Sequence, residues 1–204
     1  MSAPRPLPNR VDPFGALVAT PARGLLMGNR GGRFHRDDRT LGRPRWKTKA
    51  WIACVCQFNG RWREVWGPGY TELFFLDEVT ALAAGHRPCG QCRHADAQAF
   101  AAAFPGGGRP AVAQMDVILD AERRDGHAKR LWERPIAQLP DGAMIAIDGR
   151  AFAVRGDALL PWRFEGYGAP LKRPGAGVAT ALTPPSILAV LTAGYGPRWA
   201  GPAS

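Results

Sequence analysis

The first half of the chain contains short runs of apolar residues that are separated by turn-forming residues. Residues 50–58 are rich in aromatic and β-branched side chains, which predicts a strand. Asn59-Gly60 follows directly and favours a tight turn, so residues 61–66 are expected to return as the partner strand of a hairpin. Another apolar run predicts a strand over residues 72–76.

Helical patterns begin immediately after this strand. Asp77 has a side chain that can cap a helix and Gly85 is typical of a helix end, so a helix is expected over residues 78–84. A second helix is expected to start at residue 92 or 93 and to end at 103, before a proline and three glycines. Further helices are expected over residues 112–124 and 187–193.

The last third of the chain combines short apolar runs with Asp-Gly and Gly-Asp turns, a pattern typical of antiparallel hairpins. It predicts strands over residues 143–147, 151–155 and 159–162. These elements together indicate an α+β fold, in which a β-hairpin and helix module precedes a small antiparallel sheet with flanking helices.

Three segments are expected along the chain. Residues 1–20 contain four prolines and few periodic apolar positions, so they are expected to form a flexible basic N-terminal segment. The hairpin and helix module is expected over residues 21–104, and a small α+β lobe packed on it over residues 109–204. The glycine run at 106–108 is the candidate boundary between them.

Charge is concentrated at the start of the chain. The 204 residues carry a formal net charge of +10, and residues 1–49 hold eleven lysines and arginines against three acidic residues. A localised basic segment is typical of a protein that contacts a polyanion, above all nucleic acid. The sequence lacks both a long apolar run and the apolar stretch of a secretory signal, so we expect a cytoplasmic protein with no membrane partner.

Four cysteines form two close pairs and provide the strongest chemical signal. Cys89 and Cys92 are separated by two residues, and Cys54 and Cys56 by one. Two such pairs can complete the tetrahedral shell of one Zn²⁺ ion, so we expect a zinc-binding module. If Cys56 is instead an ordinary packed residue, His35 or His86 is the alternative fourth ligand; dithiol redox chemistry and the absence of any metal are the other interpretations.

The stretch from Phe74 to Arg93 resembles the zinc-binding N-terminal domain of the Ada methyltransferase family, and the resemblance covers about residues 70–95. It rests on a strand, a short Ala-rich helix that ends in glycine, and the knuckle Arg-Pro-Cys-Gly-Gln-Cys-Arg that follows. His86 stands where the family usually has an aromatic residue.

The resemblance implies a zinc ion held by four cysteinates, one of which attacks a methyl phosphotriester on DNA. It places Cys89 and Cys92 at the second ligand pair, and leaves Cys54 and Cys56 as counterparts of the first. The family spaces its first pair by three residues in a loop, whereas here one residue separates the pair. Cys54 is the candidate nucleophile.

Aromatic and basic residues alternate near this module. Four tryptophans lie among lysines and arginines, namely Trp46, Trp51, Trp62 and Trp66. In such a pattern the cations can bind phosphates while bases stack on exposed indole rings. Trp51 and Trp62 can instead be cross-strand partners in the hairpin. The candidate nucleic-acid-binding residues are Arg30, Arg33, Arg36, Arg43, Arg45, Lys47, Lys49, Arg87 and Arg93.

A weaker chemical cluster is formed by His35, Asp37 and Asp38, which can suit metal-dependent phosphodiester hydrolysis or can be a solvated polar turn. The sequence therefore favours a zinc protein that binds nucleic acid, with DNA preferred. The alternatives are an enzyme that acts on DNA, through alkyl transfer to Cys54 or hydrolysis at His35, and a protein-interaction adaptor with a structural zinc. The sequence leaves the oligomeric state open.

Overall fold

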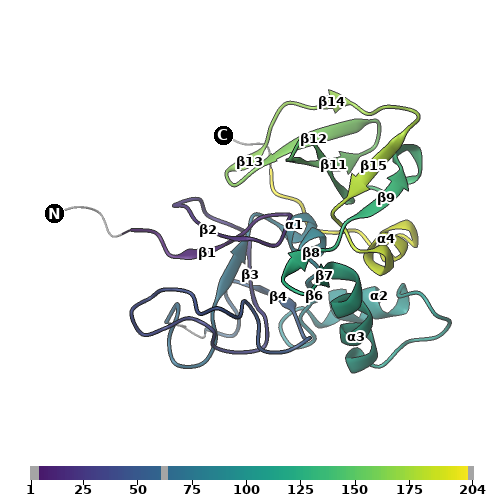
Figure 1. The fold of residues 1–204 in the computed structure, drawn as a ribbon. Helices are drawn as coiled ribbons and strands as arrows, with labels where there is room; N and C mark the ends of the chain where they lie inside the picture. The colour runs from purple at the N-terminus through teal and green to yellow at the C-terminus, as the bar shows by residue number, and fades with distance from the viewer. Residues whose placement is uncertain (1–4, 61–63, 202–204) are drawn as a thin grey trace.

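The computed structural model describes residues 5–60 and 64–201 and has an α+β fold with two main sheets (Figure 1). Four α-helices accompany the sheets in this part of the chain, together with a 3-10 turn over Ile136–Gln138. The helices are α1 (Glu78–Ala83), α2 (His94–Ala102), α3 (Val112–Arg123) and α4 (Pro185–Thr192). None of these helices is long and apolar enough to cross a bilayer.

The first sheet has six strands in the order β2-β1-β5-β3-β4-β6. It is mixed, because β1 pairs parallel to β5 and β4 pairs parallel to β6, while the other neighbours are antiparallel. The strands are β1 (Pro8–Val11), β2 (Leu17–Ala19), β3 (Leu26–Asn29), β4 (Ile52–Val55), β5 (Leu73–Phe75) and β6 (Arg87–Pro88).

The second sheet is antiparallel and has the order β13-β12-β11-β10-β15-β9, with β14 also paired to β12. Its strands are β9 (Trp132–Pro135), β10 (Met144–Ile147), β11 (Arg150–Arg155), β12 (Ala158–Arg163), β13 (Gly166–Tyr167), β14 (Leu171–Lys172) and β15 (Val178–Ala181). A small hairpin of β7 (Arg124–Asp125) and β8 (Ala128–Lys129) joins α3 to this sheet.

Helix α1 lies between the two sheets (Figure 1), and all six of its residues are buried. Ala81 packs with Leu73 and Phe75 of the first sheet. Val79 and Ala83 pack with apolar residues of the second sheet. Small side chains let both sheets approach this helix closely, so it joins two apolar cores into one body.

The N-terminus of α1 is held by Asp77, which is completely buried. One carboxylate oxygen accepts hydrogen bonds from the backbone N–H and hydroxyl of Thr80, at 2.9 and 2.8 Å. The other accepts from the Tyr167 hydroxyl at 2.9 Å and from the Ala200 N–H at 3.0 Å. Burial raises the pKa of Asp77, although these donors oppose the shift. One side chain thus ties the helix to β13 and to the C-terminal tail.

The expected fold class is confirmed, and most helices fall within two residues of their expected bounds. The expected hairpin is wrong, because β4 pairs with β3 and β6 rather than with the segment that follows it. Residues 61–63 of that segment lie outside the described residues, and Glu64–Trp66 form no strand. Within residues 1–20, where a flexible basic segment was expected, the structure forms β1 and β2 at one side of the first sheet, and residues 1–4 lie outside the described residues.

Replacing Asp77 by alanine should lower the free energy of unfolding by about 3 kcal/mol. Loss of an N-cap costs about 1 kcal/mol, and the stranded Tyr167 and Ala200 donors each cost about 1 kcal/mol more. Urea denaturation followed by tryptophan fluorescence measures the change. Asp157→Ala, at an exposed position, is the control and should stay within about 0.5 kcal/mol of wild type. Equal losses in the two variants would contradict the assigned role of Asp77.

Candidate metal centre

The cysteine knuckle is placed by a short parallel pairing between β6 and β4. Ile52 lies opposite Arg87 and Ala53 opposite Pro88. Two backbone hydrogen bonds flank this pairing, from the Arg87 N–H to the Trp51 carbonyl at 3.1 Å and from the Cys89 N–H to the Ala53 carbonyl at 2.9 Å. The second bond sets Cys89 beside the strand residue that precedes Cys54.

Three cysteines converge as a result. The sulfur atoms of Cys54, Cys89 and Cys92 all lie within 4.8 Å of one another, and this is the one group of potential metal ligands found among the described residues. Cys54 and Cys89 are buried, while Cys92 is partly exposed. Three sulfurs at this separation can hold a metal ion, and thiolate sulfur is a donor that zinc prefers.

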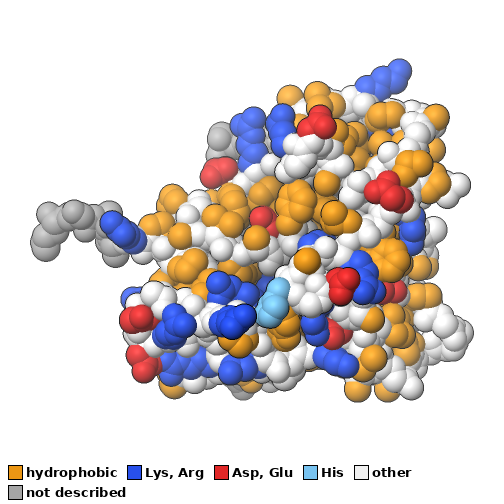
Figure 2. Space-filling model, in the orientation of Figure 1, with side chains coloured by type: hydrophobic (Ala, Val, Ile, Leu, Met, Phe, Trp, Pro, Cys, Tyr) orange, Lys and Arg blue, Asp and Glu red, His pale blue; other side chains and the backbone are white. Residues whose placement is uncertain are grey.

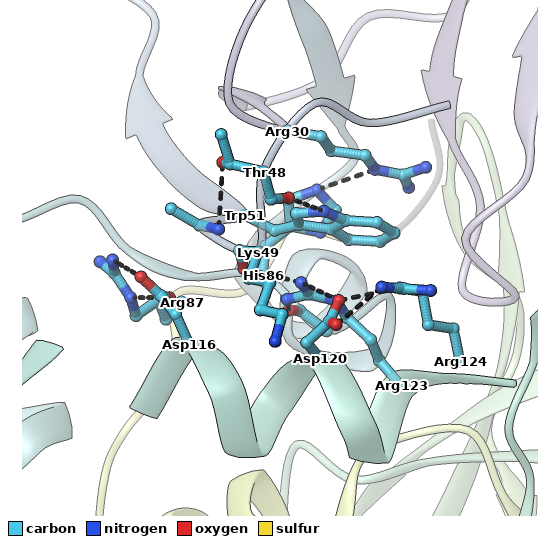
Figure 3. Close-up of polar contacts among 12 residues, drawn as sticks. Arg30, Thr48, Lys49, Trp51, His86, Arg87, Asp116, Asp120, Arg123 and Arg124 are labelled. Atoms are coloured by element: carbon cyan, nitrogen blue, oxygen red, sulfur yellow. Dashed lines mark hydrogen bonds and ion pairs between the residues drawn. The ribbon is translucent and has the colours of Figure 1, made fainter. Parts of the chain in front are cut away.

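Two buried ion pairs hold the knuckle from outside. Arg87 donates two hydrogen bonds to the carboxylate of Asp116 on α3, at 2.7 and 2.8 Å (Figure 3). Arg93, which follows Cys92, lies 2.7 Å from the carboxylate of Glu78 on α1. Because Glu78 also accepts from the Tyr195 hydroxyl at 2.6 Å, the knuckle is linked to the C-terminal segment through α1.

The three thiols share protons unequally. A hydrogen bond from Cys54 lowers the pKa of Cys89, and the backbone N–H groups of Cys92 and Gln91 add to this effect. The same hydrogen bond raises the pKa of Cys54, and burial acts in the same direction. Burial also raises the pKa of Cys92. Cys89 is therefore the sulfur on which negative charge is most stable.

A small pocket of about 100 Å³ adjoins the three sulfurs. Its wall is mostly uncharged, and among the described residues no lysine, arginine or carboxylate lines it. The pocket can admit water or a small group to the sulfurs. Besides the cysteines, its lining includes Met27, Asn29, Phe58, Tyr70 and Gln91.

Cys56 lies outside the three-sulfur group, although it lines the same pocket. It follows the end of β4 and is exposed, and its thiol donates a hydrogen bond to the Leu25 carbonyl at 3.5 Å. The expected four-cysteine set is therefore brought together only in part. The strand geometry places Cys54 and Cys56 toward the same side, but the chain beyond Val55 has left the sheet.

The two candidate histidine ligands are also elsewhere. His86 is completely buried between Trp51 and Phe75, with ring centroids at 5.1 and 4.7 Å. Burial, reinforced by neighbouring cations, holds the pKa of His86 well below its usual value. His35 stacks on Trp66 at 4.9 Å, and its Nδ1 lies 2.8 Å from the Thr71 hydroxyl.

The candidate hydrolytic cluster does not converge on His35. Asp37 pairs with Arg33, and Asp38 accepts hydrogen bonds from the backbone N–H and hydroxyl of Thr40 at 2.9 and 2.6 Å. Both carboxylates are exposed, whereas His35 is buried. This arrangement is that of a solvated turn, and these three residues form no metal-ligand group in the described chain.

The candidate nucleic-acid-binding residues fall into two sets. Arg36, Arg43, Lys47 and Lys49 are exposed, and Arg33 and Arg45 are partly exposed. Figure 2 shows lysine and arginine side chains gathered over the half of the molecule that contains β3 and β4. Buried residues make up the second set, which consists of Arg30, Arg87 and Arg93.

Sequence reasoning missed the acidic and basic residues of α3. Asp116, Asp120 and Arg123 share the buried face of the helix, where Asp116 binds Arg87 of β6 and Arg123 binds the Lys49 carbonyl before β4, while Asp120 pairs with Arg123. Their spacing of four and three residues was the available signal, since such residues lie on one helical face.

No protein-family model, no curated protein and no solved structure matches this chain.

Asp116→Asn should lower the free energy of unfolding by about 3 kcal/mol, because it leaves the buried Arg87 guanidinium without its counter-charge. Thermal or urea denaturation measures the effect. The matched control is Asp125→Asn, whose carboxylate lies 3.8 Å from Arg130 in an exposed pair. That exposed pair should contribute less than about 1 kcal/mol. A control loss as large as that of Asp116→Asn would argue against a structural role for the buried pair.

Proposed function

We propose that this chain is a zinc protein in which Cys54, Cys89 and Cys92 bind one Zn²⁺ ion. The convergence of these sulfurs from β4 and from the knuckle carries the proposal. The buried ion pairs of Arg87 and Arg93 support it, because they fix the knuckle independently of the sulfurs. Zinc would stabilise the thiolates as a Lewis acid and join the knuckle to the sheet.

The fourth coordination position is assigned to a ligand from the pocket rather than to Cys56. Zinc sites with three protein ligands leave one position for water or for an exogenous group, which is the arrangement of reactive rather than purely structural centres. The pocket beside the sulfurs has room for such a group. Alkyl transfer to Cys54, the chemistry that the Ada-type resemblance implies, would require the alkyl group to enter from this side.

Nucleic acid is the partner that we assign to the same protein. The support is the exposed cations between Arg33 and Lys49, together with the resemblance of the knuckle to the Ada-type domain. Exposed lysines and arginines bind phosphates by releasing counterions, so affinity would be independent of base sequence and sensitive to salt. Arg87 and Arg93 take no part, since buried carboxylates already neutralise them.

Native mass spectrometry of the purified chain tests the metal centre. Wild type is expected to carry one zinc per chain. Cys89→Ser should lose the zinc, because the substitution removes one of the three sulfur ligands. Cys56→Ser is the matched control and should retain the metal. Exposure to methyl phosphotriester DNA should add the mass of one methyl group if the centre transfers alkyl groups. A wild-type chain with no zinc would overturn the proposal.

Fluorescence anisotropy with a DNA duplex tests the partner. The double variant Lys47→Gln/Lys49→Gln should reduce the slope of log affinity against log salt by roughly 2, since each phosphate contact contributes about 0.9. The control is Arg163→Gln/Lys172→Gln, which removes two exposed charges from the second sheet. A slope that changes equally in both variants, or a wild type that does not bind the duplex, would contradict a nucleic-acid interface at residues 33–49.

A further inference from the structure

A second site lies on the face of β4 opposite to the three sulfurs. Side chains alternate along a strand, so Trp51, directly before β4, faces the same side as Ala53 and the opposite side from Cys54. Packing agrees with this, because Ala53 belongs to the apolar core of the first sheet while Cys54 packs against Met27.

Trp51 is enclosed by two guanidinium groups. Arg30 lies over one part of the indole at 3.9 Å from the ring centroid, and Arg123 at 4.0 Å (Figure 3). Both arginines are 2% exposed. Such stacking favours a cation over an aromatic face but supplies no counter-charge. Arg30 follows β3, Arg123 ends α3 and Trp51 precedes β4, so three segments of the chain meet here.

Backbone carbonyls orient both guanidinium groups, and Arg123 also has a carboxylate partner, Asp120 at 3.0 Å. Arg30 donates to the Gly15 carbonyl at 2.9 Å and, through Nε, to the Nε2 atom of His86 at 3.3 Å. Arg123 donates to the carbonyls of Gly85 at 3.1 Å and Lys49 at 2.7 Å. The Nε of Arg123 is buried and has no partner in the described chain.

The closeness of Arg123 to the end of α1 depends on glycine. Gly85 has a φ of +86°, and a Cβ atom there would lie 2.7 Å from the Arg123 side chain. Any other residue would be strained in this conformation and would displace the arginine. The glycine at position 85 therefore makes room for the buried guanidinium group of Arg123, which apolar packing alone would not require.

These groups line a cavity of about 420 Å³, a volume typical of small-molecule sites. The lining contains two tryptophans and a histidine, and among the described residues it contains no acidic side chain. The cations in the lining are Arg30, Arg45, Arg123, Arg124 and Lys129, and the aromatic residues are Trp46, Trp51 and His127.

Positive charge exceeds negative charge around this cavity. Asp120 pairs with Arg123 at 3.0 Å and with Arg124 at 2.7 Å, and Asp12 is the other nearby carboxylate. Two carboxylates cannot balance even the four arginines of the lining. Burial, together with the charges of Arg30 and Arg123, lowers the pKa of Lys129 to about 7. An uncompensated cluster of this kind is costly unless an anion completes it.

We propose that this cavity binds the phosphate group of a nucleotide. Guanidinium groups held in fixed directions suit phosphate oxygens, and two aromatic rings that are not enclosed, those of Trp46 and His127, suit a base. Trp46 and His127 lie next to each other, with ring centroids at 5.0 Å, and His127 is exposed, so the cavity is reached from solvent on this side. The nucleotide can be free or part of a strand; the site lies apart from the metal centre and does not depend on it.

Isothermal titration calorimetry with the full chain tests this site, using AMP, inorganic pyrophosphate and a single-stranded oligonucleotide as probes. Binding of AMP supports the site and identifies a free nucleotide as the source. Binding of the oligonucleotide alone supports the site, with a strand as the source, if Arg124→Gln weakens it more than Lys47→Gln/Lys49→Gln does, because Arg124 lines the cavity and lies outside residues 33–49. The reverse order would overturn the site. Binding of pyrophosphate as tight as that of AMP would overturn the assigned base contact. Failure of all three probes to bind would overturn the proposal.

Arg45→Gln should weaken binding of the successful probe about tenfold, because a charge-assisted hydrogen bond to phosphate is lost. Arg30→Gln should weaken binding of the probe further. Because Arg30 is buried, this variant can fail to fold, and the partly exposed Arg45 then provides the test. Arg163→Gln is the control for net charge, and equal weakening by Arg163→Gln and Arg45→Gln would overturn the site.

Zinc content measured on the same samples separates the two proposals. A chain that binds zinc but none of the three probes retains the metal centre and loses the nucleotide site. A chain that binds AMP but no zinc retains the nucleotide site and loses the metal centre.

Discussion

The arrangement of both candidate sites depends on two residues of β6 that pair in parallel with β4. This pairing places Cys89 beside the strand that carries Cys54. On the other face it sets His86 against Trp51, at 5.1 Å between ring centroids. A ladder of two residues is weak by itself, and the buried pairs of Arg87 with Asp116 and of Arg93 with Glu78 supply the additional support. The knuckle is thus held by backbone hydrogen bonds and by buried ion pairs together.

Helix α1 gives this local arrangement its place in the whole molecule. Its six residues are buried between the two sheets, and polar groups at its first turn reach β13, the knuckle and the C-terminal tail. Asp77 and Glu78 are acidic residues in an otherwise apolar interface, and each has several donors, so neither remains an unsatisfied buried charge. The C-terminal segment therefore contributes to the environment of the knuckle, although it is distant from it in sequence.

Local chemistry in the sequence was sufficient to predict some of these features. Asp77 and Gly85 marked the ends of α1 correctly, and the spacing of Cys89 and Cys92 correctly indicated a knuckle that could meet Cys54. The partner of β4 could not be predicted, since its four residues carry no information about which distant strand pairs with them. The strong turn signal of Asn59-Gly60 instead favoured a local hairpin.

Charge posed the same difficulty. Composition identified an excess of arginine near the N-terminus, but it could not separate exposed Arg43 from buried Arg30, because burial is decided by residues from α3 and the β7–β8 hairpin. Trp51 was expected as a possible partner of Trp62 in a hairpin; it lies instead between two guanidinium groups. Interactions between segments about seventy residues apart leave no periodic trace in a single sequence.

The alternation of side chains along β4 has a consequence for folding fidelity. Trp51 and Cys54 are three positions apart, so a slip of one residue against β3 would turn both away from their partners simultaneously. A slipped register would thus lose both the convergence of the cysteine sulfurs and the stacking of arginines on Trp51. A metal ion bound at Cys54 would therefore stabilise the native register of β4. The same register places Trp51, on the opposite face of the strand, between the arginines of the cavity.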